Sequence, residues 1–505
     1  MLRANIIANY LGQAYAAVSI LVALPLYGSI WGAEALGVIT FYVILNGWIF
    51  ILSSGLSPIL SRQIAIFKAA RNLGSTKHFQ VQRSLEVIFA VLTIVTFGAV
   101  FGLRQWVSEE WLNTDSVERL PEMMAVMAVA LACRWGASLF FSGLVGLEKQ
   151  VWLNGFNSVV ISLRWFSLLA VSLLFEVSLY HFFITQAVVG IVELVCLTYV
   201  FYRESKMQIK FQIGEFVIYK SEVRELGPFA AGLMYSSFLW AWILNFEKTI
   251  TSGALTMVEY GYFAFAAILA NFILRLTQPI NQAFLPRIIA AYSKRDGRVF
   301  RKTYATNCEL VIMVGIASAT VLLIVPFEVL FVVTGSEELA VYGSDLLAWM
   351  SLSAVSFLLT NLIYNFLLAC GEMRLHVINQ SIAFLVQVPL SYFLLDQFGV
   401  EVMLIGLAIV RLGHFLIYLV LIYGSFSILP GIRIGLALIL WPVVGAMLAV
   451  LLLQTTGMLD NDPTRDERWA SVGQLAVVSS IVFLSTLIFS NSTRKYVLGT
   501  KRFEH

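Results

Sequence analysis

Charged residues are scarce in this chain of 505 residues: they make up 12% of it, whereas hydrophobic residues make up 59%. Soluble domains carry about 25% charged residues. Together with a mean hydropathy of +0.84, this composition excludes an ordinary soluble protein and predicts one that crosses a membrane several times. The formal net charge of +3 is too small to indicate a nucleic-acid partner.

Cysteine is also scarce. The four cysteines, Cys133, Cys196, Cys308 and Cys370, fall in or at the ends of apolar segments, without a C-x-x-C motif or a neighbouring histidine cluster. We therefore expect neither a metal site nor a disulfide. Small buried hydrophobic side chains are the simpler interpretation of all four.

Catalytic motifs are missing as well. The loops contain no Walker sequence, nucleophile constellation, zinc-ligand spacing or acidic glycosyltransferase motif. A polytopic glycosyltransferase or sugar-polymer ligase would need a large outer loop, but the longest one, near residues 106–121, is modest. We therefore expect no enzyme and no cofactor.

Long apolar runs fill most of the chain. Segments of about 20 apolar residues match the thickness of a bilayer, and here they predict an all-α integral membrane protein with fourteen spans. The predicted spans are 5–30, 36–60, 84–105, 122–144, 152–175, 179–201, 226–247, 257–283, 304–326, 341–369, 375–395, 401–424, 433–456 and 469–490. The first run lacks a small-residue cleavage site, so it is interpreted as a span and not as a removed signal peptide.

Basic residues gather in alternate turns. If the N-terminus is cytoplasmic, the turns on that side hold most of the Lys and Arg residues, and the opposite turns hold only Arg104, Arg119, Lys248, Arg465 and Arg468. Because basic loops tend to stay in the cytoplasm, both termini are predicted to be cytoplasmic.

A short internal repeat divides the chain. GLEKQVWLN at 146–154 aligns with GEMRLHVIN at 371–379, and LSRQIA at 60–65 aligns with LPRIIA at 285–290, both with an offset of 225 residues. The shared offset predicts two duplicated six-helix bundles, a recurring plan among transporters. The predicted parts are a bundle at 1–203, a cytoplasmic linker at 204–225, a bundle at 226–425, and two additional helices with a basic tail at 426–505.

Four arginines, Arg134, Arg164, Arg275 and Arg411, lie near the middle of predicted spans. An arginine there costs about 2.5–3.5 kcal/mol on insertion scales, so water, an acid or an anionic ligand should meet each of them. Glu193 lies deep in the span 179–201. It is either a partner for one of these arginines or a carboxyl group that carries a coupling ion.

Polar residues around Arg275 form one stripe. Asn271, Arg275, Gln278 and Gln282 are spaced by four, three and four residues, which places them on one helical face. At the offset of the repeat, the polar members correspond to Asn46, Ser53 and Ser57, and Arg275 corresponds to Phe50. A polar stripe is therefore expected in both halves, with a charge in the second half alone.

The predicted substrate-binding residues are Arg275, Gln278, Gln282, Asn271, Arg411, Arg164, Arg134, Asn46 and, on a polar stripe of the first span, Asn9 and Gln13. Internal pairing is an equal alternative for Arg134, Arg164 and Arg411. Close helix packing is the alternative for Asn9 and Gln13.

The stretch GPFAAGLMYSSFLWAWILNFEKTITSGALTMVEYGYFAFA at 227–266 resembles bacterial polysaccharide and oligosaccharide-lipid flippases, including O-antigen flippases. Glu247, Lys248 and Gly261 occupy the family's acidic–basic pair and glycine, although Asp is more usual where Glu247 stands. FLPRIIAAYSKRD at 284–296 and FSGLVGLEKQVWLN at 141–154 are similar to the family's cytoplasmic loops. The resemblance covers the first twelve spans and implies the MATE-like fold of the multidrug/oligosaccharidyl-lipid/polysaccharide exporter superfamily.

This resemblance implies a bacterial inner-membrane flippase that moves an anionic oligosaccharide, carried on undecaprenyl pyrophosphate, by alternating access. The guanidinium fork of Arg275 suits a pyrophosphate ligand. The expected partners are this lipid-linked oligosaccharide, H+ or Na+ as coupling ion, membrane lipids and polysaccharide assembly proteins. Two alternatives share the fold: a MATE-type drug or cation antiporter, for which acids would be expected at mid-membrane, and a flippase of the lipid-linked peptidoglycan precursor.

Overall fold

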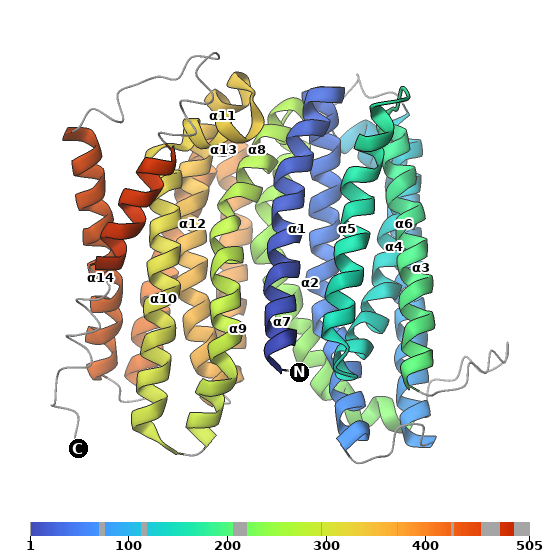
Figure 1. Cartoon of the computed structure of the whole chain (residues 1–505), viewed down its shortest axis with the longest axis horizontal. Helices are drawn as coiled ribbons and strands as arrows, with labels where there is room; N and C mark the ends of the chain where they lie inside the picture. The colour runs from blue at the N-terminus through green and yellow to red at the C-terminus, as the bar shows by residue number, and fades with distance from the viewer. Residues whose placement is uncertain are drawn as a thin grey trace. The chain divides into compact units, whose positions relative to one another are not determined.

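The computed structural model describes residues 2–69, 76–112, 119–205, 220–293, 295–370, 372–425, 429–455 and 475–488. All regular secondary structure in these ranges is helical, as the apolar runs predict (Figure 1). Contacts divide the chain into two compact units, Met1–Gly261 and Tyr262–His505.

The first unit is built around α4. Its helices are α1 (Leu2–Trp31), α2 (Ala33–Ala69), α3 (Thr76–Trp106), a π-helical turn η1 (Val107–Trp111), α4 (Leu120–Gly146), α5 (Gln150–Ser172), α6 (Leu179–Ser205) and α7 (Lys220–Ala254). Helix α4 packs against α2, α3 and α6, while α1 packs against α5 and α2. Helix α7, which the repeat assigns to the second half, packs against α2 and α3.

The second unit is built around α12. Its helices are the end of α8 (Met257–Ala270), α9 (Phe272–Ser293), α10 (Gly297–Ile324), α11 (Pro326–Thr334), α12 (Glu337–Cys370), α13 (Met373–Ser425), α14 (Leu429–Thr455) and Leu475–Ile488. Helix α12 contacts α9, α10, α11 and α13. Val311, Leu358, Leu362, Phe366 and Tyr418 belong to one apolar core that these helices share.

Each predicted span overlaps a helix of the structure. Among the described residues, nine helices are long and apolar enough to cross a membrane, and three apolar helices are shorter: Ala33–Ile49, Pro442–Leu453 and Leu475–Ile488. The predicted fold class, an all-α membrane protein, is confirmed. Most of the predicted linker at 204–225 lies outside the described residues.

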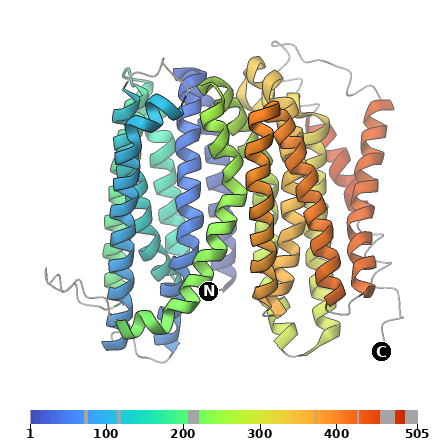
Figure 2. The same ribbon diagram turned by 180° about the vertical axis from the view of Figure 1, so that it is seen from behind.

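Two boundaries differ from the sequence expectation. The predicted spans 375–395 and 401–424 form α13, whose two halves lie side by side (Figure 2) and meet at Gly399, where φ is 86°. Glycine adopts this backbone conformation without the strain that a side chain would cause. The short helix α11 was not expected, although Pro326 at its beginning and Gly335 just after its end are typical helix boundary signals.

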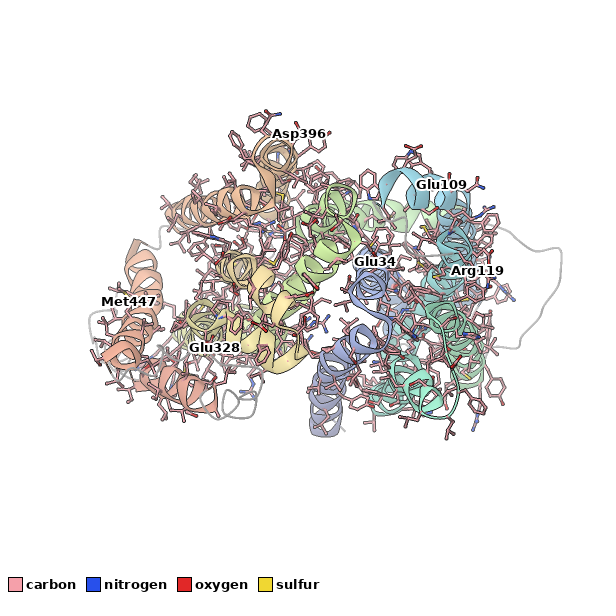
Figure 3. The ribbon with its side chains drawn as sticks, turned by 90° about the horizontal axis from the view of Figure 1, so that it is seen from above. Glu34, Glu109, Arg119, Glu328, Asp396 and Met447 are labelled. Atoms are coloured by element: carbon pink, nitrogen blue, oxygen red, sulfur yellow. The ribbon has the colours of Figure 1, made fainter. Side chains whose placement is uncertain are left out.

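Acidic residues lie at one end of each unit. Looking along the helices, Figure 3 shows Glu34 and Glu109 near one end of the first unit, with Arg119 at the beginning of α4. In the second unit, Glu328 lies in α11 and Asp396 lies close to Gly399. These residues belong to turns that the charge distribution predicts to be non-cytoplasmic, and the orientation in the membrane stays a prediction.

Gly146 allows α2 and α4 to approach closely. A Cβ atom at this position would lie 2.6 Å from the carbonyl oxygen of Ser61, which is backbone and cannot rotate away. We expect Gly146→Ala to destabilise the protein by about 1–3 kcal/mol, the usual cost of overpacking. Thermal unfolding in detergent would measure the change.

Gly98 provides the matched control for this substitution. It lies in α3, is exposed, and has no atom within 4 Å of the place that a Cβ atom would occupy. Gly98→Ala should be neutral or should stabilise the helix by up to about 1 kcal/mol. Equal effects of the two substitutions would contradict the close α2–α4 contact.

Candidate functional site

A buried ion cluster joins three helices of the first unit. Glu193 on α6 accepts a hydrogen bond of 2.7 Å from Arg164 on α5, and its carboxylate lies 3.4 Å from Nη1 of Arg134 on α4. The Glu193 and Arg164 side chains are 9% and 7% exposed, whereas that of Arg134 is 34% exposed. The cluster therefore carries one excess positive charge, with Arg134 as its accessible member.

Gln186, about two helical turns before Glu193 on α6, completes the surroundings of Arg164. The Arg164 guanidinium donates to Gln186 Oε1 over 3.1 Å, and Gln186 Nε2 donates back to the Arg164 carbonyl oxygen over 2.9 Å. A Cβ atom on Gly190 would lie 3.6 Å from Arg164 Nη2, an ordinary van der Waals contact, so Gly190 packs directly beside the guanidinium. The structure thus pairs Glu193 with both arginines, and its role in ion coupling remains a prediction.

Arg411 has a similar environment in the second unit. It is buried in the later half of α13, where Nε donates to Gln387 Oε1 over 3.1 Å and the guanidinium lies over the Phe357 ring at 4.6 Å. At the repeat offset, Arg411 corresponds to Gln186. Each unit therefore pairs a buried arginine with a buried glutamine. In the first unit the arginine lies on α5 and the glutamine on α6, whereas in the second unit the glutamine lies on the first half of α13 and the arginine on its later half.

A ladder of polar side chains continues from Arg411 along α13. His414 Nε2 lies 2.9 Å from Asn379 Oδ1, and the His414 ring stacks on Tyr418. His376 Nδ1 lies 3.4 Å from the Tyr418 hydroxyl. Their spacing of three and seven residues places Arg411, His414 and Tyr418 on one helical face, but the sequence does not show that this face meets Gln387, Asn379 and His376, which come from the other half of α13.

The stripe on α9 has a different environment. Arg275, Gln278 and Gln282 are exposed, and Asn271 is partly exposed with its amide donating to the Ala267 carbonyl oxygen. The Arg275 side chain makes no hydrogen bond, ion pair or cation–π contact with any residue that the structure describes. Because lipid cannot solvate a guanidinium, this surface must meet water or an anionic ligand.

The corresponding stripe on α2 is packed against α4. Ser53 and Ser57 are buried, the Ser57 carbonyl accepts from Ser142, and the hydroxyls of Ser57 and Ser138 lie 3.4 Å apart. Asn46 donates to the Tyr42 carbonyl oxygen of its own helix. The two stripes share a spacing but differ in exposure.

An open groove of about 660 Å³ lies between α1 and α5. The residues that line it are Leu11, Gly12, Ala14, Tyr15, Val18, Val151, Asn154, Gly155 and Ser158. The two helices are in contact at Gly12, where an added Cβ atom would lie only 2.6 Å from Asn154 Oδ1. Gln13 is partly exposed, and the side chain of Asn9 lies outside the described residues. The contact at Gly12 shows the close packing that was one interpretation of this stripe.

Comparison with known proteins identifies the class of fold. Residues 237–393 match the MatE family. The chain superposes on an inward-facing multidrug resistance MATE family transporter of the MOP superfamily with a TM-score of 0.62 at 15% identity, covering 84% of this chain and 99% of that one. The eukaryotic MATE transporter AtDTX14 gives a TM-score of 0.60 at 12% identity, covering 84% and 95% of the two chains.

The lipid II flippase MurJ, in an inward closed conformation, matches over a greater length. The TM-score is 0.68 at 12% identity, and the match covers 97% of this chain and 99% of MurJ. No curated protein matches the sequence. The chain is thus a multi-pass membrane protein with a region similar to the MatE family and with the fold of the matched MATE transporters and MurJ.

Proposed function

We propose that this protein is a flippase that moves an anionic lipid-linked oligosaccharide, carried on undecaprenyl pyrophosphate, across the bacterial inner membrane. Both termini would be cytoplasmic, and transport would proceed by alternating access. The observation that carries the proposal is the exposed, unpaired Arg275 among the described residues of a spanning helix, flanked by Gln278 and Gln282.

The chemistry of this surface favours an anion with many hydroxyl groups. A guanidinium presents a planar fork of donors that matches phosphate oxygens, and glutamine amides can donate to and accept from sugar hydroxyls. The excess charge of the Arg134–Glu193–Arg164 cluster has the same sign. A cationic drug would be repelled at both places, which argues against a drug exporter.

The extent of the MurJ match favours a second candidate substrate, the lipid-linked peptidoglycan precursor. The matched MATE transporters cover 82–85% of this chain, whereas MurJ covers 97%. A match that extends over two additional C-terminal helices would give the longer coverage that MurJ shows. Both candidates carry a sugar on a pyrophosphate, so the surface around Arg275 suits either one.

The proposed energy source is an H+ or Na+ gradient, and Glu193 is the candidate that the sequence offers for ion coupling. Membrane lipids would hold the hydrophobic tail of the substrate during transport. Polysaccharide assembly proteins would receive the oligosaccharide at the outer leaflet.

Reconstituted transport tests the substrate class. Proteoliposomes would receive a fluorescent oligosaccharide on undecaprenyl pyrophosphate, fluorescent lipid II or the cationic dye ethidium, and movement across the membrane would be followed by protection from an external quencher. We expect translocation of the lipid-linked oligosaccharide in preference to the other two. Preferential transport of lipid II would establish the second candidate, and transport of ethidium alone would reject both.

A further inference from the structure

His376 lies near the beginning of α13, within an enclosed group of polar side chains. It is 5% exposed, and its ring contacts that of Tyr364 on α12 with 4.6 Å between the centroids. Nδ1 lies 3.4 Å from the Tyr418 hydroxyl, and Nε2 lies 3.4 Å from the amide nitrogen of Gln380. Both ring nitrogens therefore face a polar partner.

The direction of these contacts defines the protonation state. With the Gln380 amide in this orientation its nitrogen faces Nε2 of His376 and can only donate, so Nε2 acts as the acceptor and carries no hydrogen in this arrangement. The ring is then neutral, with its hydrogen on Nδ1 directed at Tyr418. Gln380 is itself 3% exposed, and its Oε1 atom is buried without a hydrogen-bond partner among the described residues. An unsatisfied buried carbonyl oxygen is costly and calls for a donor.

We propose that His376 is a proton-binding site and that Gln380 is its switchable partner. A hydronium ion at the helix end would give its proton to Nε2, forming one N–H bond and leaving water. Rotation of the Gln380 amide by half a turn would replace its donor group with Oε1, which then accepts from the new N–H. Proton uptake would thus satisfy the oxygen atom that is unpaired in the neutral state.

The surroundings can hold a charged imidazole and allow it to lose its proton again. The ionisable groups on the faces packed against His376 are Tyr364 on α12 and Tyr418, His414 and Arg411 on the later half of α13; Glu372 and Arg374 lie exposed at the beginning of α13. The aromatic ring of Tyr364 attracts a cation. Among the described residues no carboxylate forms an ion pair with His376, so the charged state would not be locked.

This inference rests on the proposed transport function and identifies its coupling ion as H+. Glu193 is less suited to that task, because two arginine side chains stabilise its charged form. His376 lies two residues inside the spanning segment that begins at Arg374. Protons would therefore reach it from the aqueous phase over a short distance.

Histidine NMR of the full-length protein tests the proton site without a substrate. The protein would be labelled with 15N-histidine in nanodiscs of phosphatidylethanolamine and phosphatidylglycerol and titrated between about pH 3 and pH 8, a range that extends below the usual one for histidine because burial of His376 disfavours a charged ring. We expect one titrating signal to disappear in His376→Gln. In Gln380→Leu, which lacks the acceptor, the proton should bind about tenfold more weakly or worse, and in Gln380→Glu it should bind more tightly.

His181 is the matched control, because it is an exposed histidine at the beginning of α6 that hydrogen-bonds to Ser178. His181→Gln should remove a different signal and leave the His376 signal unchanged. If His376→Gln removes no titrating signal, or if both Gln380 variants titrate as the wild type does, the proton site is rejected. If His376→Gln does not fold, the titrations of Gln380→Leu and Gln380→Glu test the proton site on their own.

Transport in proteoliposomes separates this inference from the proposed function. With a pH gradient across the membrane, wild type and His181→Gln should show faster translocation of the lipid-linked oligosaccharide, whereas His376→Gln should show the basal rate only. A wild type that transports no lipid-linked substrate would reject the function but not the titration. Equal stimulation of wild type and His376→Gln would reject the coupling role alone.

Discussion

Arg275→Ala is expected to reduce translocation of the lipid-linked oligosaccharide by roughly 10- to 100-fold. A hydrogen bond between charged groups is worth about 1.5–3 kcal/mol, and about 1.4 kcal/mol corresponds to a factor of ten. The side chain has no partner among the described residues, so its loss should leave the fold intact. The initial rate in proteoliposomes, and surface glycan in a flippase-deficient strain at equal expression, would measure the effect.

A conservative substitution at Arg275 and a control substitution at a second arginine make this test more specific. Arg275→Lys keeps the charge but loses the planar fork, so it should retain an intermediate activity. Arg298→Ala removes an exposed arginine at the beginning of α10 and serves as the matched control, for which wild-type transport is expected. If Arg275→Ala transports as fast as the control, the phosphate contact is absent and the proposed headgroup site must be abandoned.

The helices were predictable because a membrane simplifies the problem. A segment that crosses hydrocarbon must be apolar over about 20 residues and must satisfy its backbone internally. Composition along the chain therefore located α3, α4 and α12 and even the turn at Gly399 inside α13. Helix α11 was missed because its nine residues are too few for a span, so it leaves no long apolar run of its own.

Partners between helices were less predictable. Periodicity shows which residues share a face, but it does not show which helix that face meets. Arg164 shares a face with Asn154, yet its guanidinium bonds to Glu193 and Gln186 on α6, while Asn154 donates to the Gln150 carbonyl oxygen of its own helix. At the repeat offset Gln186 corresponds to Arg411, but Arg164 corresponds to Pro389 and Gln387 to Ser162, so the repeat indicates only one member of each buried Arg–Gln pair.

Side-chain size explains why equal spacing gave unequal exposure on α2 and α9. Serine is small enough to pack between helices and to satisfy its hydroxyl on a neighbouring backbone or hydroxyl group, as Ser57 does with Ser138. Arg275 is longer and carries five donors, and no acidic or amide side chain among the described residues meets it as Glu193 and Gln186 meet Arg164. The repeat therefore predicts which positions of α2 and α9 correspond, but it does not predict whether their side chains are buried or exposed.

Glu193→Ala is expected to destabilise the protein by about 3–5 kcal/mol, the usual cost of leaving a buried charge without its partner. Arg164 is 7% exposed and would lose the carboxylate that neutralises it, while Arg134, at 34% exposure, could still be hydrated. Thermal unfolding in one detergent would show the loss. In Glu122→Ala, which breaks an exposed pair with Arg119, the cost should be at most about 1 kcal/mol.

A double substitution separates the structural role of this cluster from a role in transport. Replacing both Arg164 and Glu193 with methionine removes the buried charges together, and such replacements are often neutral or stabilising. We expect this variant to recover most of the stability that Glu193→Ala loses. If it also transports at the wild-type rate, the cluster only holds α4, α5 and α6 together. If stability returns but transport does not, the variant still carries the positive charge of Arg134, so it is the position that Glu193 gives to Arg134 that contributes to moving an anionic substrate. If Glu193→Ala unfolds at the same temperature as the wild type, the buried ion cluster itself is contradicted.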